Sequence, residues 1–158
     1  MIDITKVAEV KVTYSSNIPI RERIKISGSK DMADLMNQWW DKFSPDTKEY
    51  VESFAIALLN RANYVLGARC IGLGGTAGTV LDIKVVAQHA LKTNAHSIIL
   101  CHNHPSGNIT PSEQDKSLTK TIVNGLKMLD ITVLDHIIIS GDPDVYYSMA
   151  DNWDMPQP

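Results

Sequence analysis

HSIILCHNHPSGNITPSEQD, residues 96–115, is the stretch that decides the fold expected for this chain. Residues 96–101 form a short continuous apolar run, which is typical of a strand buried on both faces. A polar loop follows, and then a helix is expected from about Pro111 to Leu129. A second apolar run, ITVLDHIII, occupies residues 131–139. We therefore expect two central strands connected through a helix.

The rest of the chain predicts further elements of both kinds. Strands are expected at 7–14, 51–59, 63–71 and, as a short piece, 145–149. Two more helices are expected, one capped by Asp31 that runs to about Phe43 and one capped by Asp82 that ends near Asn94. Residues 15–30 and the glycine-rich segment 72–78 are expected to be loops.

This alternation predicts an α/β (α+β) fold with three layers, α-β-α, around a mixed central sheet. The expected organisation is a strand-and-loop extension at 1–30, one domain at 31–152 and a flexible tail at 153–158. The chain has 158 residues, and a domain of this size buries a core without disulfides or a structural metal. A metal, if one is bound, is therefore not needed to hold the fold.

Composition excludes several function classes. The formal net charge is −3 and the basic residues are scattered, which argues against tight non-specific binding to DNA. Two cysteines without a CxxC pair form neither a disulfide framework nor a cysteine zinc site. The sequence contains no secretory signal and no apolar run of about 18 residues. We therefore expect a cytoplasmic protein that does not enter a membrane.

Two histidines directly after the apolar run are candidate metal ligands. His102 and His104 are two residues apart, so both imidazoles leave an extended strand on the same side. Zinc binds imidazole nitrogen and carboxylate oxygen, and a catalytic site uses three protein ligands with one position open for water. With Asp115 as the third ligand, this set would hold one zinc ion per chain.

The alternative for Asp115 is a capping pair with Ser112 at the start of the helix. Thr110 is the expected cap, because Pro111 then takes the first helical position and Glu113 completes a capping box with Thr110. Ser112 and Asp115 would then have no capping role and would lie on one helical face near the histidines. This reasoning favours Asp115 as a metal ligand.

Glu52 is the candidate general base, since the sequence has no HExxH helix that would supply one. It begins the expected strand 51–59 in phase with Phe54 and Ile56, and a carboxylate on the apolar side of a strand usually has a function. The alternative is a fraying strand end beside Glu49.

Other polar and aromatic residues are expected to be structural. His136 follows Asp135 inside a buried strand and is expected to be satisfied by a neighbour, with a role in the site as the alternative. Trp39 and Trp40 are expected to pack in the core, with a partner surface as the alternative. Three further residues are not expected to be ligands, namely His89, His96 and Cys101.

The site residues match the JAMM pattern of the JAB/MPN metalloprotease superfamily. That pattern is a distant glutamate, His-x-His, seven residues and Ser-x-x-Asp. Here it reads Glu52, His102, His104, seven residues, Ser112 and Asp115. The segment HNHPSG at 102–107, together with Pro111-Ser112 and the later Leu134-Asp135-His136, resembles the bacterial RadC-like branch. The resemblance covers about residues 30–150.

The resemblance implies a three-layer fold similar to that of cytidine deaminases. It implies one zinc ion held by His102, His104, Asp115 and a water molecule. It also implies Glu52 as the base and the Ser112 hydroxyl as a stabiliser of the oxyanion. The expected function is a zinc-dependent metallohydrolase of JAMM type that cuts a peptide or isopeptide bond in a peptide or protein substrate.

Two other functions stay open. One is a RadC-like accessory role in DNA repair or recombination without proteolysis. Full-length RadC-like proteins often carry an N-terminal helix-hairpin-helix segment associated with DNA, and residues 1–30 are too short and too strand-like for it. The other is a binding module with a vestigial metal site. The sequence names neither the substrate nor the oligomeric state.

Overall fold

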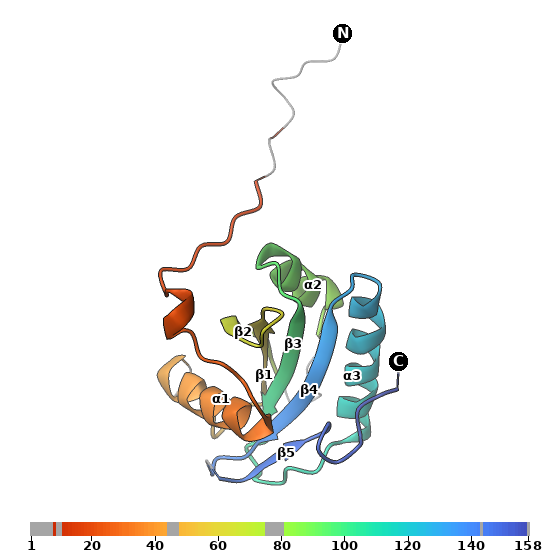
Figure 1. Cartoon of the computed structure of the whole chain (residues 1–158). Coiled ribbons are helices and arrows are strands. Elements are labelled where there is room, and N and C mark those ends of the chain that lie inside the picture. Colours follow the sequence, from red (N-terminus) through yellow and green to blue (C-terminus); the bar gives the residue numbers. More distant parts are fainter. Residues whose placement is uncertain (1–7, 9–10, 44–47, 75–80, 143, 158) are drawn as a thin grey trace.

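A five-stranded mixed sheet forms the middle layer of the computed structural model, which describes residues 8, 11–43, 48–74, 81–142 and 144–157 (Figure 1). The strand order is β2-β1-β3-β4-β5. Neighbouring strands are antiparallel except for the parallel pair β3 and β4. The strands are β1 (Ser53–Leu59), β2 (Val65–Leu73), β3 (Ser97–Asn103), β4 (Thr132–Ile139) and β5 (Tyr146–Ser148).

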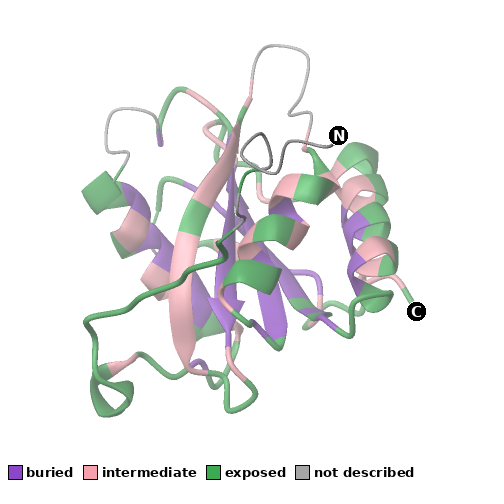
Figure 2. Cartoon of the chain, turned by 90° about the horizontal axis from the view of Figure 1, so that it is seen from above, coloured by how far each residue is buried: buried purple, intermediate pink, exposed green. Residues whose placement is uncertain are grey.

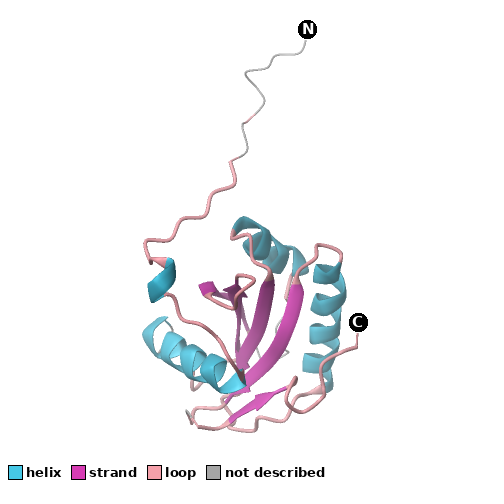
Figure 3. Cartoon of the chain, viewed as in Figure 1, coloured by secondary structure: helices cyan, strands magenta, loops and turns pink. Residues whose placement is uncertain are grey.

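Helices cover both faces of this sheet (Figure 3). Helix α1 (Ser29–Phe43) lies on one face, and α2 (Ile83–Lys92) and α3 (Glu113–Lys127) lie on the other. A short 3-10 turn, η2 (Ile20–Glu22), precedes α1. The predicted three-layer α-β-α fold with a mixed sheet is confirmed. None of the helices in the described part of the chain is long and apolar enough to cross a membrane.

Two buried hydrophobic clusters lie on the two faces of the sheet. The α1 cluster consists of Ile26, Met32, Ala33, Met36, Trp40, Ala55, Ala57, Leu59, Ile99, Cys101, Ile137 and Ile139. The α2–α3 cluster consists of Phe54, Ile56, Leu58, Val86, Ala90, Ala95, Ile98, Leu100, Ile122, Leu126, Ile131 and Val133. Alternate residues of β1 and β3 enter different clusters, because successive side chains of a strand point to opposite faces. The central strands are therefore buried on both sides (Figure 2).

A bulge in β4 changes which face its later residues meet. The pairing of β4 with β3 slips by one residue between Val133 and Asp135, so that Leu134 is an extra residue. Val133 belongs to the α2–α3 cluster and Ile137 to the α1 cluster, although residues four apart in a regular strand share a face. The bulge thus turns His136, between them, toward the α2–α3 side.

The N-terminal region differs from the sequence-based expectation. The strand predicted at 7–14 is wrong where it is described, because residues 8 and 11–14 form no strand. Helix α1 begins at Ser29, so Asp31 is not its cap but lies in the first turn, where Oδ2 accepts from the amide of Ser27 at 2.8 Å. The loop predicted at 72–78 is wrong at Gly72 and Leu73, which end β2, and residues 75–78 of it lie outside the described residues.

The contrast between two aromatic residues of α1 gives a test of the core. Trp40 is fully buried, whereas Phe43 is 60% exposed. We expect Trp40→Ala to lower the free energy of unfolding by about 3–5 kcal/mol and Phe43→Ala to lower it by less than about 1 kcal/mol. Urea unfolding followed by circular dichroism measures both. Equal losses would contradict the placement of α1.

Candidate metal centre

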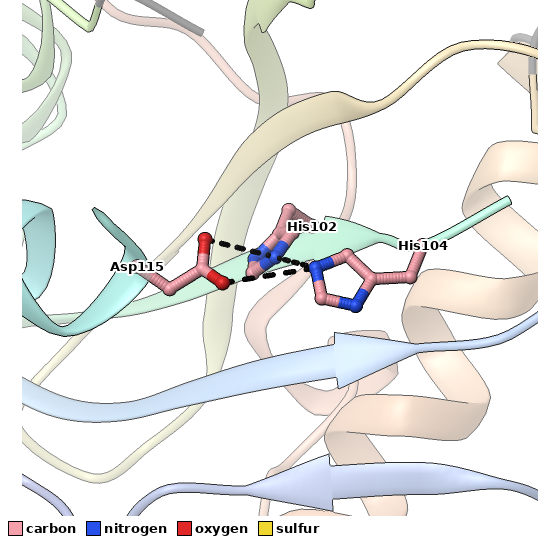
Figure 4. Close-up of side chains that lie close together, drawn as sticks. All are labelled: His102, His104 and Asp115. Atoms are coloured by element: carbon pink, nitrogen blue, oxygen red, sulfur yellow. Dashed lines mark hydrogen bonds and ion pairs between the residues drawn. The ribbon is translucent and has the colours of Figure 1, made fainter. Parts of the chain in front are cut away.

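Three side chains with metal-binding atoms meet where β3 ends and α3 begins (Figure 4). His102 lies at the end of β3, His104 follows it, and Asp115 comes from the first turn of α3. One ligand atom from each residue lies within 4.8 Å of the others. Within the described residues, these three side chains form the group of histidines and carboxylates that could hold one metal ion.

The distances between the ligand atoms fit a small cation. The Nε2 atoms of His102 and His104 are 2.8 Å apart. Nε2 of His102 lies 3.3 Å from Oδ1 of Asp115, and Nε2 of His104 lies 3.7 Å from Oδ2. Ligands at about 2.0–2.2 Å from a tetrahedral zinc ion are about 3.3–3.6 Å apart. The side chains are therefore arranged almost as a zinc ion requires.

The orientation of His104 is fixed by a backbone partner. Its Nδ1 lies in short hydrogen-bonding contact with the carbonyl oxygen of Asn108, and a carbonyl oxygen only accepts. Nδ1 of His104 therefore carries the ring hydrogen. In the neutral imidazole this leaves the lone pair on Nε2, which faces His102 and Asp115.

His102 is nearly enclosed. Its side chain is 5% exposed, and its ring stacks on Phe54 with centroids 5.8 Å apart and planes 7° apart. Burial lowers the pKa of His102 from 6.5 to about 4; the Asp115 carboxylate opposes this shift and His104 adds to it. Burial likewise lowers the pKa of His136 well below 6.5. The imidazoles of His102 and His136 are therefore neutral near pH 7. For His102, the neutral ring is the form that binds a metal ion.

The expected capping arrangement of α3 is wrong. The N-cap is Ser112, not Thr110, and the capping box joins Ser112 to Asp115. Oγ of Ser112 accepts from the amide of Asp115 at 3.1 Å, and Oδ2 of Asp115 accepts from the amide of Ser112 at 2.7 Å. The amide of Thr110 binds Oδ1 of Asn108 at 3.0 Å, so the chain is still in a turn there. The predicted partner Glu113 is the first residue of the helix instead.

Capping and metal binding use different parts of the same carboxylate. Oδ2 of Asp115 also accepts from the hydroxyl of Ser112 at 2.6 Å. Oδ1 faces His102 and makes no capping bond. The capping box therefore does not compete with a ligand role; it holds the carboxylate in the direction of the histidines.

Glu52 is not one of the clustered residues, and its side chain is exposed. It lies just before β1, where the antiparallel register pairs Phe54 with His102. The strand pairing ends at Phe54 and His102, and Glu52 and His104 each lie two residues beyond that pair at the same end of the two strands. The structure thus places the backbone of Glu52 beside the cluster without a contact from its carboxylate to the ligands.

Asn103, between the two histidines, holds that backbone in place. Its Oδ1 accepts from the amide of Ser53 at 2.7 Å, and its Nδ2 donates to the carbonyl oxygens of Lys48 at 2.7 Å and Val51 at 2.9 Å. Asn103 is buried, and its bonds fall on both neighbours of Glu52. One amide side chain therefore joins the segment before β1 to the end of β3.

Two residues behind His102 were not assigned to the site from the sequence. His136 was expected to be structural, and its Nε2 lies 2.7 Å from Nδ1 of His102. The hydroxyl of Thr119 in α3 contacts the other ring nitrogen of His136. The signal in the sequence was the polar pair Asp135-His136 inside an apolar strand. His89 and His96 lie outside the cluster.

Comparisons with known proteins match most of this chain to one family. The RadC-like JAB domain family matches residues 26–154. The chain is 38% identical over 127 residues to a UPF0758 protein of Flavobacterium johnsoniae, which covers 80% of this chain and 52% of that protein. It is 37% identical over 140 residues to a UPF0758 protein of Alkaliphilus metalliredigens, covering 89% of this chain and 58% of that protein. The chain spans little more than half the length of these relatives.

Replacement of Asn103 tests the link between β3 and the segment before β1. Asn103→Ala leaves the buried amide of Ser53 without its partner, so we expect the free energy of unfolding to fall by about 1–3 kcal/mol. Asn108→Ala is the matched control, because that side chain binds the exposed amide of Thr110. Urea unfolding of the metal-free proteins compares the two; losses of the same size would contradict the link.

The low pKa of His102 predicts how stability changes with pH. Between pH 6.5 and about 4 the unfolded chain binds a proton that folded His102 excludes. This contribution to stability is therefore complete above pH 6.5 and is lost as the pH falls toward 4. Urea unfolding in the presence of a chelator should show a shallower loss over this range for His102→Gln than for the wild type. Parallel curves would be inconsistent with the assignment.

Proposed function

Because the chain belongs to the RadC-like JAB domain family, we propose that it is a zinc-dependent metallohydrolase that cuts a peptide or isopeptide bond. One observation carries the proposal. Two imidazole nitrogens and one carboxylate oxygen converge within 4.8 Å at the end of a buried strand. A catalytic zinc site uses such a set of three ligands and keeps a fourth position for water.

His102, His104 and Asp115 would hold the ion. When bound, zinc makes water nucleophilic near neutral pH and polarises a carbonyl group. The protein supplies what such an ion needs beforehand, since the histidines are only 5% and 12% exposed and the carboxylate is oriented by its helix cap. Little reorganisation of these side chains would be required on binding.

Glu52 is the group proposed to move the proton. Its carboxylate would accept a proton from the attacking water and return it to the leaving amine. Its exposed side chain is accessible to water and substrate, and the residue lies two positions before Phe54, which pairs with His102. Its backbone carbonyl accepts from the amide of Gly74 at 2.6 Å, and Asn103 anchors the residues on either side. This anchoring would fix the base while its side chain stays free to turn.

Ser112 is proposed to stabilise the oxyanion that forms on the attacked carbonyl. Its hydroxyl is exposed and donates to Oδ2 of Asp115 at 2.6 Å. Rotation about one side-chain bond would turn this hydrogen toward a substrate oxygen in front of the cluster. The hydroxyl would then give up its bond to Oδ2 of Asp115, so the step exchanges one hydrogen bond for another, while Oγ still accepts from the amide of Asp115.

Metal analysis tests the ligands. We expect the wild type to bind one zinc ion per chain and His104→Ala to bind it at least about 100-fold more weakly, because one of three ligands is lost. His96→Ala is the control, since this exposed histidine lies outside the cluster. Titration of the metal-free proteins against a zinc-binding dye measures the affinities. Unchanged zinc binding by His104→Ala would show that the ion is held elsewhere.

A second test concerns the base. Glu52→Gln should keep zinc but lower the rate of cleavage by about 10²–10⁴-fold, because the proton acceptor is lost. Glu49→Gln, another exposed glutamate before β1, should cleave as the wild type does. Mass spectrometry of new amino termini in a peptide library gives the rates. Equal cleavage by Glu52→Gln would remove Glu52 from the reaction.

A further inference from the structure

Two buried side chains behind the metal centre form a hydrogen-bonded chain that ends on His102. Nε2 of His136 lies 2.7 Å from Nδ1 of His102, and Nδ1 of His136 lies 2.6 Å from Oγ1 of Thr119. Oγ1 of Thr119 lies 2.6 Å from the backbone oxygen of Asp115. The chain thus begins at one proposed ligand and ends at another.

The direction of these bonds follows from their first member. The backbone oxygen of Asp115 only accepts, so the hydroxyl of Thr119 donates its single hydrogen there. The sulfur of Met149, 3.7 Å from the same hydroxyl, is a weaker acceptor and does not compete. Oγ1 of Thr119 must then accept from His136, and Nδ1 of His136 carries the ring hydrogen.

This direction continues to His102. With its hydrogen on Nδ1, neutral His136 accepts at Nε2, so Nδ1 of His102 must donate to it. The lone pair of His102 is then on Nε2, which faces His104 at 2.8 Å. The carbonyl of Asn108 imposes the same tautomer on His104. Two lone pairs that face each other, with a carboxylate beside them, form a site for a cation and not for a hydrogen bond.

Burial makes this chain independent of water. His136 and Thr119 are both 0% exposed. The β4 bulge at Leu134 is what turns His136 to this side of the sheet, and the edge of the Phe54 ring, with centroids 5.3 Å apart, packs against it. The partners of each ring nitrogen are therefore fixed by the fold.

We propose that Thr119 and His136 are positioning residues that hold His102 in the tautomer whose Nε2 faces the metal centre. The proposal rests on the metal site proposed above. Neither residue touches the ion or the substrate. Both act through His102, and the backbone of Asp115 sets the direction of the chain. Partners of this kind behind a metal-binding histidine change metal affinity by about 10–100-fold.

The direct test reads the tautomer in metal-free protein. Long-range ¹H–¹⁵N correlation spectra at pH 8, with a chelator present, distinguish a hydrogen on Nδ1 from one on Nε2. We expect the Nδ1–H form for His102 in the wild type and in Thr119→Ser. In Thr119→Val, His136 loses its acceptor, and His102 should gain the Nε2–H form. Thr121→Val is the matched control, because Thr121 makes the same bond to the backbone four residues earlier but contacts no histidine.

Zinc affinity is the second readout. Thr119→Val should bind zinc about 10–100-fold more weakly than the wild type, and Thr119→Ser and Thr121→Val should bind as the wild type does. If Thr119→Val does not fold, Thr119→Ala makes the same test. The proposal is overturned by an Nε2–H form of His102 in the wild type, by an unchanged tautomer in Thr119→Val, or by its unchanged zinc affinity. A wild type that has the expected tautomer but binds no zinc would refute the proposed function and leave the hydrogen-bonded chain standing.

Discussion

A buried imidazole needs a partner at each ring nitrogen, and in this fold that constraint falls on His102. β3 is covered on both faces, so the first polar side chain on its α2–α3 side has no water to use. Nδ1 is served by His136 of β4, whereas Nε2 faces the acceptor atoms of His104 and Asp115, where a cation is the partner that would satisfy it. The sheet register and the β4 bulge bring His136 to Nδ1 of His102, and the start of α3 brings Asp115 to Nε2.

Much of the architecture could be predicted from the sequence, because apolar runs such as 96–101 reveal burial on two faces without knowledge of their partners. The pairing of His102 and His104 followed from their spacing in the same way, whereas the argument for Asp115 rested on a cap at Thr110 that the structure does not have. The strand expected at 7–14 failed for the complementary reason. Alternation shows that a segment is compatible with a strand, but pairing depends on an available edge, and residues 11–14 pair with none of the described strands.

The features that could not be predicted are those that depend on contacts between two segments of the chain. The cap of α3 falls on Ser112 because the side chain of Asn108 already holds the amide of Thr110 in a turn. The place of His136 depends on one extra residue in β4, which appears only when its register with β3 is known. The position of the α3 cap changes the role of Asp115, and the β4 bulge changes the side of the sheet that His136 faces. Neither change is visible in the local sequence pattern.

Asp115 both caps α3 and faces the two histidines, and this links the stability of the helix end to metal binding. The carboxylate that begins α3 also faces the histidines, so order in the first turn of the helix and occupancy of the centre are linked quantities. Fraying of that turn would displace the carboxylate, and an ion bound to it would oppose fraying by the same free energy. Hydrogen exchange of the backbone amides in the first turn of α3 would therefore slow when a metal ion binds, and this measurement needs no substrate.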